Sequence, residues 1–228
     1  MAAMSVRGEV GAFEAFGRAV AQFVHGGEPG RRPARNCLAT RTGRLGGACC
    51  GLAVALALLV GSSCARAESD TTVAEYRIKA AFLFKFVGFI DWPPATFDRA
   101  DAPFTIGVLG GATLGHELEQ IVAGRQVNGH AVRVRLLGRG DSPTGLQVLF
   151  VGRGEATRLN ALAASGDGVP VLVVSESDGA LALGSAINFV VVDDKVRFDV
   201  ALHSINRAGL KISARLLAVA RVVQPDPS

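Results

Sequence analysis

The sequence predicts a single three-layer α/β domain, in which a mostly parallel sheet carries helices on both faces and an antiparallel hairpin at one edge. Three observations predict this fold. Segments with the pattern of strands alternate with segments with the pattern of helices. Several of the strand segments are unbroken runs of Val, Leu and Ile, which is typical of parallel strands buried on both faces. The adjacent Asp193 and Asp194 separate two apolar runs and indicate a hairpin turn.

The elements are expected in the following order. A helix at 71–90 opens the domain and stops at Trp92, because the two prolines after it cannot continue a helix. The strands are expected at 103–110, 130–138, 145–152 and 168–177, with two more around the aspartate turn within 185–202. The further helices are expected at 111–124, 154–165 and 205–223.

The charge distribution argues against nucleic acid as a partner. The whole chain carries a formal charge of +4. Residues 1–67 hold eight arginines and three glutamates, a net charge of +5, whereas residues 68–228 hold 16 basic and 17 acidic side chains, a net charge of −1. The expected domain, 68–228, therefore has no basic surface excess for DNA or RNA.

The N-terminal part has the pattern of an export signal. Within 41–67, arginines precede a short apolar run, and Ala65-Arg66-Ala67 forms a small-residue cleavage site, so cleavage is expected after Ala67. The apolar run is shorter than a membrane span requires. A retained anchor and lipidation at Cys64 are the alternatives. Residues 1–40 are expected to be a non-native or disordered extension, because signal peptides rarely begin so late in a chain.

The expected first helix is unusually rich in aromatic residues. One apolar stripe faces the sheet at helical spacing, and a second stripe of Ile78, Phe82 and Phe89 lies on the side of Lys85. Either neighbouring elements cover the second stripe, or it docks a second subunit or a partner protein. The candidate docking residues are Ile78, Phe82, Lys85, Phe89 and Trp92. The stripe expected to face the sheet is Val73, Tyr76, Ala80, Leu83, Val87 and Ile90.

No combination of residues in the expected domain indicates catalysis, a metal site or a cofactor. The glycines in 107–115 lack the dinucleotide-binding spacing, and His116, His130 and His203 lack the spacing of metal ligands. A small ligand could still bind at the strand ends, where the candidate residues are Gly110, Gly111, Ser175 and Asp178. An enzyme of unrecognised type is the least favoured reading.

Four segments together resemble one family. Residues 76–93 (YRIKAAFLFKFVGFIDWP), 103–110 (PFTIGVLG), 171–202 and 208–223 are similar, in order and spacing, to the YfiR/HmsC-like family of periplasmic regulators. The resemblance implies an exported, non-catalytic α/β domain without cofactors. It further implies a protein that binds the periplasmic sensor domain of an inner-membrane diguanylate cyclase of the YfiN type and represses it. Repression of the cyclase would lower cyclic di-GMP and biofilm formation. The resemblance also implies a homodimer.

One feature departs from the resemblance. The best-known members carry cysteines in the folded domain, with a disulfide tied to redox control. All four cysteines of this chain lie within 1–67, and the expected domain has none. Redox control by that route is therefore not carried over to this chain.

Overall fold

The computed structural model describes residues 72–93, 96–97, 99, 101–164 and 170–226. The expected extension, the expected signal peptide with its cleavage site after Ala67, and Cys64 all lie outside the described residues. Among the residues that are described, no helix reaches the length and apolarity that a membrane span requires.

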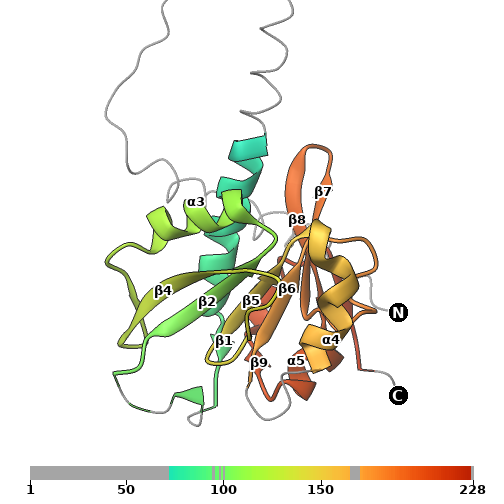
Figure 1. Ribbon diagram of the computed structural model, residues 1–228. Coiled ribbons are helices and arrows are strands. Elements are labelled where there is room, and N and C mark those ends of the chain that lie inside the picture. Colours follow the sequence, from blue (N-terminus) through green and yellow to red (C-terminus); the bar gives the residue numbers. More distant parts are fainter. Residues whose placement is uncertain (1–71, 94–95, 98, 100, 165–169, 227–228) are drawn as a thin grey trace, which may run out of the picture.

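An eight-stranded mixed sheet forms the centre of the domain (Figure 1). Its strands are β2 (Phe104–Leu109), β3 (Gln126–Val127), β4 (His130–Leu137), β5 (Val148–Val151), β6 (Leu172–Ser175), β7 (Ile187–Val192), β8 (Lys195–Ala201) and β10 (Val222–Gln224). They lie in the order β10-β8-β7-β6-β5-β2-β4-β3. The pairs from β4 through β2, β5 and β6 to β7 are all parallel, whereas β7 and β8 are antiparallel.

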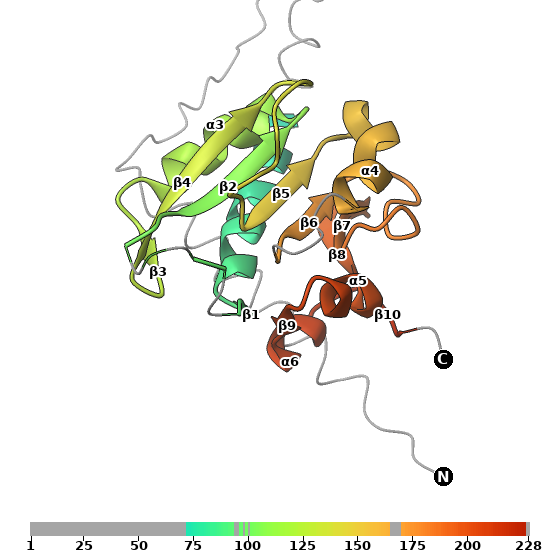
Figure 2. The ribbon, with the colours of Figure 1, turned by 60° about the horizontal axis from the view of Figure 1, so that its bottom comes forward.

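Helices cover both faces of this sheet (Figure 2). They are the aromatic helix at 72–87, α3 (Ala112–Val122), the 3-10 helix η2 (Arg153–Arg158), α4 (Leu159–Ala164), α5 (Leu202–Arg207) and α6 (Ala214–Leu217). The aromatic helix and α3 share a core cluster with Val148 and Phe150 of β5. Leu149 and Val151 belong to a second cluster with Leu159 of α4. Since alternate residues of a strand point to opposite faces, the predicted three-layer fold is confirmed.

The hairpin between β7 and β8 is also confirmed, and its loop consists of the two aspartates. Asp193 and Asp194 both have positive φ, 50° and 56°, which suits the tight two-residue turn between antiparallel strands. The hairpin lies one strand inside the edge of the sheet, because β10 pairs with the outer side of β8. Asp and Asn tolerate this backbone region better than most residues, which explains their use here.

The prediction of one helix at 205–223 is wrong. The segment instead contains α5, a reversal at Gly209 with φ +66°, the short strand β9 (Lys211–Ile212), α6 and β10. β9 pairs antiparallel with β1 (Ile90–Asp91), so the end of the aromatic segment is strand and not helix. Ser213 then caps α6 by accepting a hydrogen bond from the Arg215 N–H. Both errors arise because strand pairing between distant segments overrides the helical spacing.

The second stripe of the aromatic helix is covered at its centre. Phe82 is only 2% exposed, because its ring lies against Phe86 of the same helix and against Phe189 and Phe198 of the hairpin. Ile78 is 37% exposed. Of the two readings left open for the stripe, burial by neighbouring elements therefore holds for Phe82. Most of the first stripe is buried as expected: Ala80, Leu83, Val87 and Ile90.

Candidate functional site

A buried ion pair joins the aromatic helix to the carboxyl end of β6. Lys79 is 1% exposed, and its Nζ lies 2.5 Å from Oε2 of Glu176, which is also buried. Lys79 also pairs with Glu75, one helical turn earlier, whose side chain is partly exposed. Glu176 directly follows β6, so this contact fixes the loop at the strand end against the helix.

Two further groups complete the hydrogen bonding of Glu176. The hydroxyl of Tyr76 donates to the second carboxylate oxygen, Oε1, at 3.2 Å, and Arg153 Nε donates to the backbone carbonyl at 3.2 Å. Burial raises the pKa of the Tyr76 phenol, and the neighbouring Glu176 carboxylate raises it further. Tyr76 therefore stays protonated and acts as a donor at neutral pH. A buried charge pair with its remaining oxygens satisfied is the arrangement that a folded protein tolerates.

The glycines predicted at a ligand site instead allow two strand-end turns to pack closely. Gly110 has φ +69°, and a Cβ there would lie 2.8 Å from Cγ of Glu155. A Cβ on Gly152 would lie 2.3 Å from the carbonyl oxygen of Gly110, and one on Gly111 would lie 2.8 Å from the Phe150 ring. The space beside Gly110 and Gly111 is thus filled by protein atoms, which favours a strand-to-helix turn.

Glu155 is the charged centre of this turn. Its carboxylate accepts from Arg139 Nε at 2.9 Å and from Arg158 Nη1 at 3.5 Å. The hydrogen bond from Arg139 is the main reason that the pKa of Glu155 lies below its ordinary value of 4.5. The two arginines are contributed by the loop after β4 and by η2, so the pair of turns is held by charge as well as by close packing.

Replacing Glu155 by glutamine is expected to reduce the acid sensitivity of the fold. Because the folded pKa is lowered, the carboxylate stabilises the fold above its unfolded pKa and loses that effect as pH falls through the folded value. Urea unfolding at neutral pH and near pH 4 measures the difference. Between neutral pH and about pH 4, the free energy of unfolding should fall more in the wild type than in E155Q. The control is Glu119→Gln on the exposed side of α3, and equal losses in wild type and E155Q would contradict the expectation.

A groove lies beside the hairpin at the carboxyl ends of β5 and β6, and we call it the hairpin groove. Its volume is about 660 Å³. Arg221, at one wall, is held by both of its Nε and Nη2 groups to the carboxylate of Asp199. The residues that line the groove are Arg153, Ala156, Glu176, Ser177, Asp178, Phe189, Val190, Val191, Val192 and Arg221.

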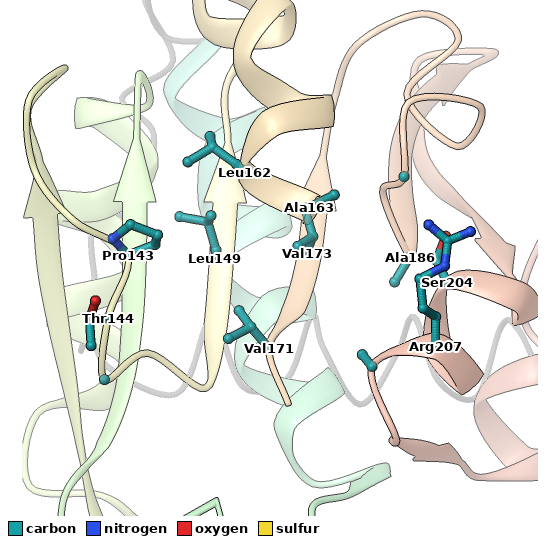
Figure 3. Close-up of a pocket in the computed structure, with 13 residues that line it drawn as sticks. Pro143, Thr144, Leu149, Leu162, Ala163, Val171, Val173, Ala186, Ser204 and Arg207 are labelled. Carbon is teal, nitrogen blue, oxygen red and sulfur yellow. The ribbon is translucent and has the colours of Figure 1, made fainter. Parts of the chain in front are cut away.

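A second, smaller pocket of about 120 Å³ lies on the sheet face that α4 covers. Figure 3 shows Leu149, Val171 and Val173 of the β5–β6 region pointing toward it, with Leu162 of α4 above and Arg207 of α5 at the far side. None of the predicted ligand residues lines this pocket. Aliphatic side chains form most of its lining, and Thr144, Ser204 and Arg207 add polar groups.

The predicted ligand residues do not come together in one site. Ser175 is fully buried, and its hydroxyl donates to the Val151 carbonyl at 3.0 Å, so the side chain is already used inside the sheet. Asp178 is exposed and lines the hairpin groove. Gly110 and Gly111 contribute to neither pocket. Only Asp178 therefore remains near a space that a ligand could enter.

The predicted docking residues also separate. Lys85, Phe89 and Trp92 are all partly buried, and the Trp92 ring stands at 90° to Phe104 with centroids 4.9 Å apart. Ile78, at 37% exposed, is the most accessible of the set. The exposed apolar surface of this helix is thus narrower than the sequence pattern indicated, since Phe82 belongs to the core.

The three histidines among the described residues have structural contacts. His130 stacks on Phe97 with ring centroids 3.8 Å apart, and its Nδ1 lies 2.6 Å from the Ala102 carbonyl oxygen. His116 lies 3.5 Å from Glu119, and His203 lies 3.2 Å from the Ser204 hydroxyl. Over the described ranges, no group of three or more His, Cys, Asp or Glu side chains is arranged to hold a metal ion.

Comparison with known proteins identifies one family. A family model described as YfiR/HmsC-like matches residues 76–221, which include both Lys79 and Glu176 of the buried pair. A solved structure of a conserved domain protein from Vibrio cholerae O1 biovar eltor str. N16961 is 10% identical with a TM-score of 0.42. That match covers 53% of this chain and 54% of the other, so the chain spans about half the length of that relative, and the likeness carries no argument. No curated protein matches.

Proposed function

Because the chain belongs to the YfiR/HmsC-like family of periplasmic regulators, we propose that it binds and represses a membrane-bound diguanylate cyclase of the YfiN type. Binding would be to the periplasmic sensor domain of the cyclase, and the result would be less cyclic di-GMP and less biofilm. The observation that carries the proposal is the extent of the family match, which reaches from the aromatic helix to Arg221, the residue before β10. Export through a signal peptide that is cleaved after Ala67, and a homodimer, belong to the same proposal.

The surface of the aromatic helix supports a docking role at one end. Ile78 is exposed on a helix that is well packed on its other sides. Lys79, the next residue, forms the buried pair with Glu176, and Phe82 in the next turn is in the core. An apolar side chain on a rigid, well-packed helix loses little conformational entropy when a partner covers it. Ile78 is therefore the residue of the predicted set that we propose for direct contact, with Lys85, Phe89 and Trp92 as partly buried candidates further along the chain.

The test is the level of cyclic di-GMP in Gram-negative cells that carry a YfiN-type cyclase, with and without the full chain. Expression is expected to lower the level, and the cyclase's periplasmic domain is expected to co-purify with the chain. Ile78→Asp should weaken both effects, whereas Leu183→Asp should not, because Leu183 has the same 37% exposure but lies in the turn region between β6 and β7. An unchanged level with the chain present in the periplasmic fraction, and no co-purification, would refute the proposal.

A small-ligand binding module is the alternative function, and it can coexist with the first. The observation in its favour is the hairpin groove, where Asp178 and two arginines surround an open space. A thermal-shift screen of small polar metabolites tests it. A shift that is lost in Asp178→Asn would support the alternative, and no shift from any compound would count against it.

A further inference from the structure

Strand β7 continues beyond the end of its neighbour β6. The β6–β7 ladder ends at the pair Ser175 and Asn188, whereas β7 stays paired with β8 as far as Val192 and Lys195. Within the described part of the chain, residues 189–192 thus have no strand beside them on the β6 side. The hairpin exposes an open strand edge at the place where β6 would have continued.

The pairing register determines which backbone groups face this open edge. In a two-residue hairpin, the residues that flank the loop, here Val192 and Lys195, exchange backbone hydrogen bonds. Alternate residues of β7 then also face β8, in agreement with the bond from Ala201 N–H to the Ala186 carbonyl. Val191 lies between two such positions, so its N–H and C=O point toward the open edge. Its side chain is 43% exposed.

The hairpin groove occupies the space beside this edge. Four consecutive residues of β7, 189–192, line it. Successive side chains of a strand point to opposite faces, so a groove that contacts all four must run along the backbone edge. The loop that follows β6, residues 176–178, forms its other wall. An extended segment laid in the groove would continue the line of β6 and pair with β7.

The charges of the groove indicate what such a segment carries. Glu176 is neutralised by Lys79, and Arg221 is neutralised by Asp199. Among the described residues, Arg153 donates to the Glu176 carbonyl and makes no ion pair, and Asp178 is exposed and makes none either. One cationic and one anionic side chain of the lining are therefore left for a ligand.

Ser177 gives an independent indication that the groove takes a polar ligand. Its side chain is 7% exposed, and its hydroxyl has no hydrogen-bond partner among the residues that the structure describes. Burying a hydroxyl without a partner is unfavourable, and such groups in native proteins need an explanation. Ser177 belongs to the loop that forms one wall of the groove, so the backbone of a segment bound there is a candidate partner for this hydroxyl.

We propose that the hairpin groove binds an extended segment of a partner protein by strand addition to the edge of β7. The segment pairs its backbone with Val191, and it presents an acidic side chain to Arg153 and a basic side chain to Asp178. These two side chains stand at alternate positions, on one face of the added strand. The identity of the partner, the periplasmic domain of a cyclase, rests on the proposed function, but the chemistry of the groove does not.

The first experiment uses a synthetic peptide and needs no cyclase. The probe is acetyl-Val-Glu-Val-Lys-Val-amide, and the uncharged reference peptide has threonine in place of Glu and Lys. We expect the charged peptide to bind about tenfold more tightly, since hydrogen bonds between charged groups exceed neutral ones. It should slow hydrogen exchange at the Val191 amide by about tenfold or more, because that amide becomes bonded.

Matched variants separate the strand edge from the side chains. Val191→Pro removes the N–H that faces the groove but takes no bond from the β7–β8 ladder, so it should abolish binding. Val191→Ala retains the N–H and should bind nearly as well as the wild type. Arg153→Gln and Asp178→Asn should each remove most of the preference for the charged peptide. Far-UV circular dichroism checks that each variant folds. If Val191→Pro does not fold, hydrogen exchange at the Val191 amide of the wild type shows whether the peptide binds at the edge of β7.

The second experiment tests the same variants with the cyclase's periplasmic domain. Loss of co-purification in V191P, but not in V191A, would support the groove as the cyclase site. If the domain binds V191P normally and the peptide does not protect Val191, the groove proposal is overturned while the proposed function stands. If the peptide binds but the domain does not, the proposed function fails and the groove stands. If V191P instead abolishes self-association and no peptide binds, the edge joins two copies of this chain and the proposal is wrong.

Discussion

Lys79→Ala is expected to lower the free energy of unfolding by about 3–5 kcal/mol, because it leaves the carboxylate of Glu176 buried without its cation. The Tyr76 hydroxyl alone cannot compensate a full negative charge in a site from which water is excluded. Urea unfolding at neutral pH, followed by far-UV circular dichroism, measures the loss.

A double variant shows whether this loss comes from the unpaired charge. Lys79→Met combined with Glu176→Leu replaces the pair by apolar groups of similar size, and such replacements are often neutral or stabilising. The double variant should therefore be more stable than Lys79→Ala alone. If Lys79→Ala lowers the free energy of unfolding by less than about 1 kcal/mol, the pair behaves as a surface ion pair. The buried role that the geometry indicates for Lys79 and Glu176 would then be wrong.

The buried pair was not predictable from local sequence patterns. Glu75 and Lys79 stand at the spacing of a surface ion pair on a helix, and that local pattern gives no sign that Lys79 is buried. Its second partner, Glu176, lies 97 positions away. The polar run 175–178 directly after an apolar strand indicates a loop and a candidate ligand site, and not an ion pair with the first helix. A lysine within an otherwise apolar helix face would have been the more useful signal.

The fold was more predictable than the site for a physical reason. The strands β2, β5, β6 and β7 are each identified by an apolar run, and the turn at Asp193 by its own residues, so these predictions needed only local information. The strand β9 could not be found in this way, because Lys211 and Ile212 form a strand only through pairing with β1. The hairpin groove likewise depends on where two neighbouring strands end, and periodicity places strand boundaries only approximately.

Phe82→Ala is the second change expected to have a large effect, with a loss of about 3–5 kcal/mol in the free energy of unfolding. The ring contacts Phe86 of its own helix and both Phe189 and Phe198 at the base of the hairpin, with centroid distances of 5.9–6.3 Å. Removing it opens a cavity between the aromatic helix and β7–β8, in a region where the surrounding strands are fixed by pairing and cannot collapse to fill it.

The matched control is Ile78→Ala, four positions earlier on the same helix, where the side chain is exposed. A loss of less than about 1 kcal/mol is expected there, since little apolar surface is withdrawn from water. Comparing the two variants also separates an effect on folding from an effect on docking. Ile78→Ala should weaken cyclase binding in a fully folded protein, whereas Phe82→Ala should lower the amount of folded protein first. If Phe82→Ala is as stable as the wild type and loses binding, Phe82 is a docking residue after all, and its place in the core is wrong.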